Sequence, residues 1–166
     1  MIKNGQETLW ILVGILGAVA NLYGLAQPSP QLYYVIGSCL LLVTAIYFRL
    51  TYFIALELIL ISGHGAILLG IGPVLQVVLP ILLCAQLLIY YVMSGQLGHI
   101  FRLIGISGIA LLSIGFAYEN QWIFLFGSME VAIFAFYQVY RGRYIALLWA
   151  ILNTIFMLLA TYQLLL

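Results

Sequence analysis

The chain has 166 residues, of which 66% are hydrophobic and 5% are charged, with a formal net charge of +1. A soluble globule cannot keep that much apolar surface away from water, so the composition predicts an integral membrane protein and excludes a soluble domain. The near-neutral charge offers no basic stripe, so no nucleic-acid partner is expected.

Seven hydrophobic runs follow one another along the chain, separated by short connections. A bilayer core about 30 Å thick is crossed by about 20 helical residues. The runs lack the alternation of barrel strands, so helices are the expected spanning form. We therefore predict an all-α, polytopic, seven-helix protein that forms a single membrane domain over residues 1–166. The runs cover residues 10–12 to 26, 31–48, 52–70, 73–93, 101–118, 121–140 and 144–165.

The basic residues all fall on one side of the membrane if each run spans it. The opposite side holds Glu119 and no cation. Because basic residues close to segment ends are retained in the cytoplasm, this bias predicts a cytoplasmic N-terminus and an external C-terminus, in a bacterial inner membrane. The basic residues are Lys3, Arg49, Arg102, Arg141 and Arg143.

An internal repeat is indicated when the chain is shifted against itself by 90 or 91 residues. The shift predicts two parallel triple-helix units, residues 10–70 and 101–165, joined by a linker helix at 73–93 in a 3+1+3 plan. Transporters commonly place the substrate site between such repeats, near the bilayer midplane. The shift aligns Gly14 with Gly105, Gly17 with Gly108, Gly24 with Gly115, Gly37-Ser38 with Gly127-Ser128 and Ala45 with Ala135.

Few polar side chains are predicted at membrane depth, and the chain contains no Asp. Glu57 and His64 lie seven residues apart and so share one face of a helix. Glu130 lies within a later run, and a protonatable group there would allow proton coupling. Intramembrane ionisable groups are functional candidates by default, although a hydrogen-bonded structural carboxyl or a packed His is the alternative. Amides and hydroxyls at similar depth are Asn21, Ser62, Gln86, Asn153 and Thr154.

Aromatic residues crowd the ends of the runs, where most are expected to anchor the protein in the headgroup belt. Trp122, Tyr137 and Trp149 are the candidates for stacking on a solute or gating it. Trp149 and Asn153 are one helical turn apart and share a face.

Enzymatic functions are poorly supported by the sequence. The two histidines, His64 and His99, fall in different segments without metal-ligand spacing, and the Gly-x-Ser-x-Gly and phosphate-binding motifs are missing. No catalytic residue, metal or cofactor is therefore predicted.

The second repeat resembles PnuC-type vitamin transporters, which are relatives of the SWEET sugar carriers. The resemblance lies in Glu119 to Trp122, Gly127 to Phe136, and Tyr144 through Asn153. It implies the 3+1+3 plan and facilitated diffusion of nicotinamide riboside or a similar vitamin, with Trp and Asn side chains in a central site. The Gly-x-x-Asn of that family falls on Gly127 to Glu130, where a carboxyl replaces the amide.

We therefore expect a transporter or facilitator of a small organic solute, vitamin-, nucleoside- or sugar-like, bound between the two units. The alternative is a structural or assembly subunit of a larger membrane complex, or a homo-oligomer. A receptor with the same kind of cavity is not distinguished by the sequence. The predicted solute-binding residues are Glu130, Glu57, His64, Gln86, Trp122, Tyr137, Trp149 and Asn153.

Overall fold

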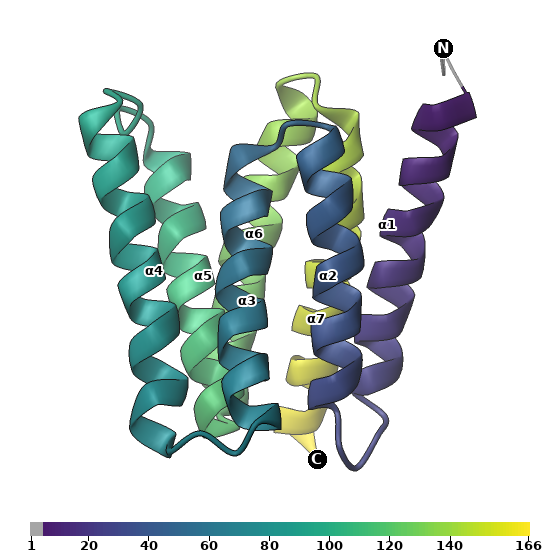
Figure 1. The fold of residues 1–166 in the computed structure, drawn as a ribbon, viewed down its shortest axis with the longest axis vertical. Helices are drawn as coiled ribbons and strands as arrows, with labels where there is room; N and C mark the ends of the chain where they lie inside the picture. The colour runs from purple at the N-terminus through teal and green to yellow at the C-terminus, as the bar shows by residue number, and fades with distance from the viewer. Residues whose placement is uncertain (1–4) are drawn as a thin grey trace.

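The computed structural model describes residues 5–166, and every regular element in that range is helical (Figure 1). The all-α prediction and the number of long helices are confirmed. The first helix begins at Gly5 and ends at Gly24, earlier at both ends than predicted, and Lys3 lies outside the described residues. The elements are α1 (Gly5–Gly24), α2 (Gln31–Tyr47), α3 (Thr51–Leu68), α4 (Pro73–Met93), α5 (Ile100–Tyr118), α6 (Gln121–Tyr140), the 3-10 turn η1 (Tyr144–Ala146) and α7 (Leu147–Leu165).

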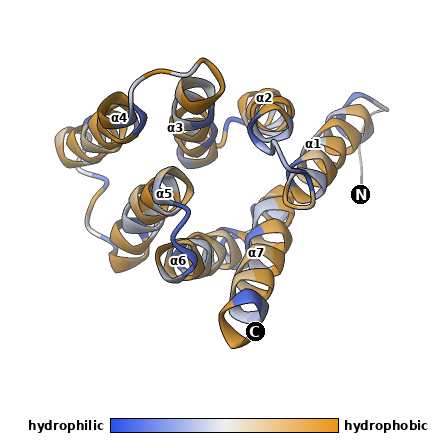
Figure 2. Ribbon diagram, turned by 90° about the horizontal axis from the view of Figure 1, so that it is seen from below, coloured by the Kyte–Doolittle hydropathy of each residue, from blue (hydrophilic) through white to orange (hydrophobic). Residues whose placement is uncertain are grey.

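Each helix packs against the next one in the chain, as expected for short connections. Helices α1 to α4 follow one another along one side of the molecule, and α5 to α7 return along the other (Figure 2). Contacts of α3 with α5 and of α1 with α7 join the two sides. The described start of the chain and its C-terminus lie at opposite ends, because seven is an odd number of passes (Figure 1).

The outer surface is apolar along most of the bundle. Leu16 is 61% exposed, Val92 56% and Ile151 50%. Six of the seven helices in residues 5–166 are long and apolar enough to cross a membrane, whereas α2 is apolar but has 17 residues. The chain is therefore an integral membrane protein with six candidate spans.

Several helices end on a residue in the left-handed region, which turns the chain sharply back. Gly70, Gly95 and Gly142 have φ of 65°, 66° and 86°, a conformation that glycine adopts without a steric penalty. Arg49 and Glu119 occupy the corresponding place after α2 and α5, with φ of 55° and 51°. A side chain in this conformation costs roughly 1–2 kcal/mol, so both positions carry local strain.

Small residues allow α1 and α2 to approach closely, and the same is true of α5 and α6. A Cβ on Gly17 would lie 2.8 Å from the carbonyl oxygen of Gly37. A Cβ on Gly108 would lie 2.9 Å from the backbone nitrogen of Val131. Lipid gives helices no hydrophobic reason to associate, so such contacts supply much of the packing energy. These glycines therefore serve the close packing of neighbouring helices.

Aromatic side chains fill the space between the two sides of the bundle near the start of α3. Phe53 stacks on Trp149 of α7, with ring centroids 4.4 Å apart. The Tyr52 ring lies 4.0 Å from that of Phe134 in α6, and its hydroxyl donates a 2.7 Å hydrogen bond to the carbonyl of Gly105 in α5. This layer ties α3 to three helices of the opposite side and excludes solvent there.

Candidate functional site

Four of the eight predicted site residues meet around one small cavity inside the bundle. Glu57 and His64 reach it from α3, and Trp149 and Asn153 from α7. The cavity volume is about 20 Å³, and all four side chains are at most 3% exposed. Because these helices belong to opposite sides of the bundle, the cavity lies between the two predicted triple-helix units.

Glu57 makes the central polar contact of this cavity. Its Oε1 accepts a 2.7 Å hydrogen bond from the indole Nε1 of Trp149. The stack of Trp149 on Phe53 fixes the plane of the indole and so directs its N–H at the carboxyl. The second carboxyl oxygen, Oε2, is buried and has no hydrogen-bond partner among the described residues.

Two further polar atoms on the same cavity are also without a partner in the described chain. Asn153 donates through Nδ2 to the carbonyl of Trp149, 2.9 Å away, but its Oδ1 accepts nothing. The Ser38 hydroxyl, on α2, is buried close to the Glu57 carboxyl but makes no hydrogen bond of full geometry in the described chain. A buried polar group left unsatisfied costs about 1–3 kcal/mol. Three such groups on one cavity therefore point to a bound molecule, and a cavity of this size holds about one water.

An aromatic group lies on one side of the cavity. The His64 ring lies 4.8 Å from the Tyr34 ring of α2 and 4.5 Å from the Phe116 ring of α5. His64 Nδ1 forms a hydrogen bond with the side-chain amide of Gln31, with 2.9 Å between Nδ1 and Oε1. We call Tyr34, His64 and Phe116 the aromatic gate.

A larger pocket lies beyond the aromatic gate, at the end of the bundle where α5 meets α6. Its volume is about 410 Å³, and it shares Tyr34 and Phe116 with the small cavity. We call it the vestibule. Its polar lining residues are Gln31, Glu119, Asn120, Gln121 and Gln163. The small cavity therefore has a wide pocket on one side and the packed layer of Tyr52, Phe53 and Phe134 on the other.

The other four predicted residues lie elsewhere. Gln86 is exposed, and Trp122 is 58% exposed at the start of α6, as an interfacial anchor would be. Tyr137 stacks on Phe101, with centroids 4.4 Å apart, and accepts a hydrogen bond from Arg141 at the basic end of the bundle.

Glu130 is half-buried on the outer side of the α5–α6 pair. Its Oε2 accepts a hydrogen bond from the hydroxyl of Ser107, which is itself exposed. Ser107 lines an open apolar groove between α4 and α5 and not the small cavity. Glu130 is thus a half-buried carboxyl of the α5–α6 pair that does not line the small cavity.

Sequence reasoning missed several residues of this region. Ser38 appears in the sequence only as part of the repeated Gly-Ser pair, and Tyr34 and Phe116 read as ordinary interfacial or packing aromatics. Asn21, recognised as polar at depth, lines the cavity from α1 and is 5% exposed. The repeated Gly-Ser pair was the one signal that pointed to Ser38.

A metal is not favoured in this region, since no group of three or more His, Cys or acidic side chains gathers anywhere in residues 5–166. No family model, no curated protein and no solved structure matches this chain.

Proposed function

We propose that the protein is a transporter of a small organic solute, bound in the cavity formed by Glu57, Ser38 and Asn153. The observation that carries this proposal is that three buried polar atoms, none with a hydrogen-bond partner in the described chain, line the same cavity. The vestibule lies next to this cavity, beyond the aromatic gate. Polar groups buried without a partner destabilise a membrane bundle, so their gathering on one cavity favours a molecule bound there.

The chemistry of the cavity favours a solute that donates hydrogen bonds. The free atoms of Glu57 and Asn153 are both carbonyl-type oxygens, and the Ser38 hydroxyl can accept as well as donate. Hydroxyl, amide or amine groups of a solute would satisfy all three. Vitamins, nucleosides and sugars, the solutes implied by the PnuC-type and SWEET-like resemblance, all carry such donors.

Binding such a solute requires the gate to move. The present cavity, about 20 Å³, admits no organic molecule, so this conformation is a closed one. The aromatic gate separates it from the vestibule, and the Tyr52 layer closes the other end. Opening these two barriers in turn would give alternating access between the units.

The same proposal includes seven membrane crossings and a 3+1+3 duplication. The 17 residues of α2 are about the shortest helix that crosses a bilayer core. The duplication is supported by matching contacts: Gly24 meets Tyr34, while Gly115 meets Phe124 at the shifted positions. The shift by 90 or 91 residues relates α1 to α5 and α3 to α7. The contact of α3 with α5 therefore corresponds to the contact of α7 with α1, and both are present.

Orientation is proposed from charge. Arg49, Arg102 and Arg143 lie at the end of the bundle where α2 joins α3, α4 joins α5 and α6 joins η1 (Figure 1). Basic ends face the cytoplasm, so the vestibule would open to the outside. The compartment proposed is the bacterial inner membrane.

A pair of serines provides the matched test. Ser38 and Ser128 are both 0% exposed and both unpaired in the described chain, but only Ser38 lines the cavity. Uptake of a panel of nucleosides, vitamins and sugars would be measured in reconstituted vesicles. We expect saturable uptake of at least one compound, weakened in Ser38→Ala and retained in Ser128→Ala. Equal uptake in both variants, or no uptake above empty vesicles, would contradict the proposal.

The second candidate, an assembly subunit, is favoured by Glu130 alone. A half-buried carboxyl that is bonded to the exposed Ser107 is costly beside lipid, and a polar group of a partner helix would satisfy it further. Purification in mild detergent distinguishes the two candidates: a subunit elutes with a partner that Glu130→Leu releases, whereas a transporter elutes without one.

A further inference from the structure

The atoms without a partner in the small cavity all accept hydrogen bonds. Glu57 Oε2 and Asn153 Oδ1 are carbonyl-type oxygens. The Ser38 hydroxyl lies close to the Glu57 carboxyl, and its oxygen can accept a hydrogen bond even while its hydrogen points at that carboxyl. A single group with three N–H donors would therefore serve all three atoms.

Glu57 also has no counter-charge in the cavity. Among the described residues that line it, Glu57 is the one acidic residue and none is Lys or Arg. His64 lines the cavity as well, but its Nδ1 is bonded to the side-chain amide of Gln31. A carboxylate inside a membrane protein is costly unless a cation pairs with it. A cationic ligand would supply the charge that the cavity walls do not.

Aromatic rings form much of the remaining wall. Tyr34, Phe116, Trp149 and Phe156 all line the cavity, from four different helices or helix turns. The face of an aromatic ring carries partial negative charge, which attracts a cation within about 6 Å of the ring centre. The wall therefore favours a cation over an anion in the same position.

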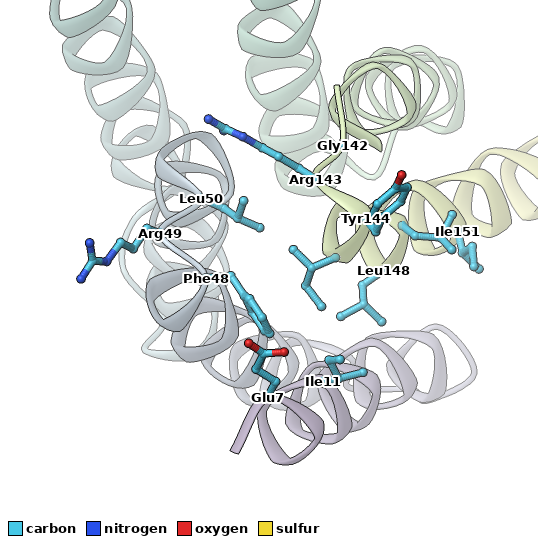
Figure 3. A pocket seen from close by; sticks show the side chains of 12 residues that line it. Glu7, Ile11, Phe48, Arg49, Leu50, Gly142, Arg143, Tyr144, Leu148 and Ile151 are labelled. Atoms are coloured by element: carbon cyan, nitrogen blue, oxygen red, sulfur yellow. The ribbon is translucent and has the colours of Figure 1, made fainter. Parts of the chain in front are cut away.

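The charges at the two ends of the bundle favour the same sign of ligand. Glu119 is exposed on the vestibule, and none of the described residues lining the vestibule is Lys or Arg. The pocket lined by Arg49 and Arg143 lies at the opposite, basic end and has a volume of about 630 Å³ (Figure 3). Figure 3 shows both guanidinium groups extended away from that pocket. A cation that enters through the vestibule thus meets a carboxylate before it reaches Glu57.

We propose that the solute carries a protonated primary amino group, and that Glu57, Ser38 and Asn153 bind this group in the small cavity. The assignment rests on the proposed function of the same site and narrows its solute to an amine. The amino group pairs with the Glu57 carboxylate and donates its other hydrogens to Ser38 and Asn153. A cavity of about 20 Å³ has room for this group alone, so the rest of the solute extends past Tyr34 and Phe116 towards the vestibule.

Ammonium and potassium ions test the site without a guess at the rest of the solute. They have the same charge and nearly the same radius, but ammonium alone donates hydrogen bonds. Thermal unfolding of the purified protein in detergent would be measured in the two chloride salts at equal concentrations. We expect ammonium at ten times its dissociation constant to raise the unfolding temperature by about 3–5 °C relative to potassium. Equal temperatures at all concentrations would overturn the proposal, and would be the result if Glu57 were neutral.

Glu57→Gln and Ser128→Ala form the matched pair of variants. Glutamine keeps an oxygen for the indole N–H of Trp149, and so keeps the bond between α3 and α7, but it has no charge. Ser128 is buried but does not line the cavity. We expect the ammonium effect to disappear in Glu57→Gln, to weaken in Ser38→Ala and to persist in Ser128→Ala. An effect of full size in Glu57→Gln and Ser38→Ala would place ammonium elsewhere and overturn the assignment.

Ethanolamine and choline show whether the site takes the amino group of a larger molecule. Choline keeps the positive charge but has no N–H donor. We expect ethanolamine, and not choline, to raise the unfolding temperature and to enter vesicles that contain the wild type. An effect of ammonium alone would overturn the assignment to an organic amine.

Uptake and binding separate the two proposals. Binding of ethanolamine without uptake would support the amino-group site and contradict transport. Uptake of compounds that lack an amino group, together with no effect of ammonium or ethanolamine on unfolding, would support transport and overturn the amino-group site.

Discussion

The indole nitrogen of Trp149 donates a 2.7 Å hydrogen bond to the carboxyl of Glu57, 92 residues away in the sequence and on the opposite side of the bundle. Both side chains are at most 1% exposed. A hydrogen bond to a carboxyl in a low-dielectric interior is stronger than one at a surface, and leaving either partner alone is costly. This contact fixes how α3 and α7 face one another across the cavity.

Trp149→Phe removes the donor while keeping an aromatic ring against Phe53. Glu57 is then left with both carboxyl oxygens unpaired, so we expect a loss of about 1–3 kcal/mol in stability. Thermal unfolding in detergent measures it. Trp122→Phe is the matched control, since Trp122 is 58% exposed and should leave the unfolding temperature almost unchanged. Equal unfolding temperatures for both variants would contradict a structural role for the bond.

Replacing both partners separates stability from transport. In Glu57→Leu/Trp149→Phe both side chains are apolar, so neither leaves a buried polar group without a partner. Such double replacements are often nearly neutral for stability. We expect the double variant to unfold closer to the wild type than Trp149→Phe does, but to lose uptake in vesicles. Retained uptake would mean that the carboxyl does not contact the solute.

Glu130→Gln should leave transport, and its dependence on pH, unchanged. Glu130 bonds to the exposed Ser107 on the outer side of α5 and α6 and does not line the cavity. Uptake measured at several values of pH, alongside Glu57→Gln, checks this. If Glu130→Gln alone changed the pH dependence of uptake, Glu130 would be the residue that couples transport to protons.

Gly127→Ala tests the close packing of α5 on α6. The added Cβ would lie 2.5 Å from the backbone nitrogen of Leu112, so the helices must separate. We expect a destabilisation of roughly 1–3 kcal/mol, read from thermal unfolding. Gly65→Ala is the control within α3, because a Cβ there meets nothing within 4 Å and alanine favours the helix. A stable Gly127→Ala protein would show that the α5–α6 contact is looser than described.

The helices could be predicted from the sequence because each apolar run is long and its ends carry glycine or polar residues. The pairing of Glu57 with His64, and of Trp149 with Asn153, also follows from helical spacing. Which face of a membrane helix turns inward could not be predicted, since the lipid-facing and buried sides are equally apolar.

Glu130 illustrates that limit. A Cβ on Gly108 would lie 2.9 Å from the Cβ of Glu130, so Glu130 lies in the α5–α6 contact, where its carboxyl reaches Ser107 and not the small cavity. The contribution of Ser38 depends on which face α2 turns towards α3, and no local pattern encodes that face.

Phe116→Ala should open the aromatic gate. Its ring lies 5.1 Å from the Tyr34 ring and 4.5 Å from the His64 ring, between the vestibule and the cavity. Removing it joins the two spaces, so we expect a transported solute to equilibrate faster and larger analogues to be admitted. Initial uptake rates for a series of analogues measure this. The control is Phe126→Ala, since Phe126 is 47% exposed and lines neither space. If the two variants transport alike, the solute does not pass between Tyr34 and His64, and the vestibule is not its entrance.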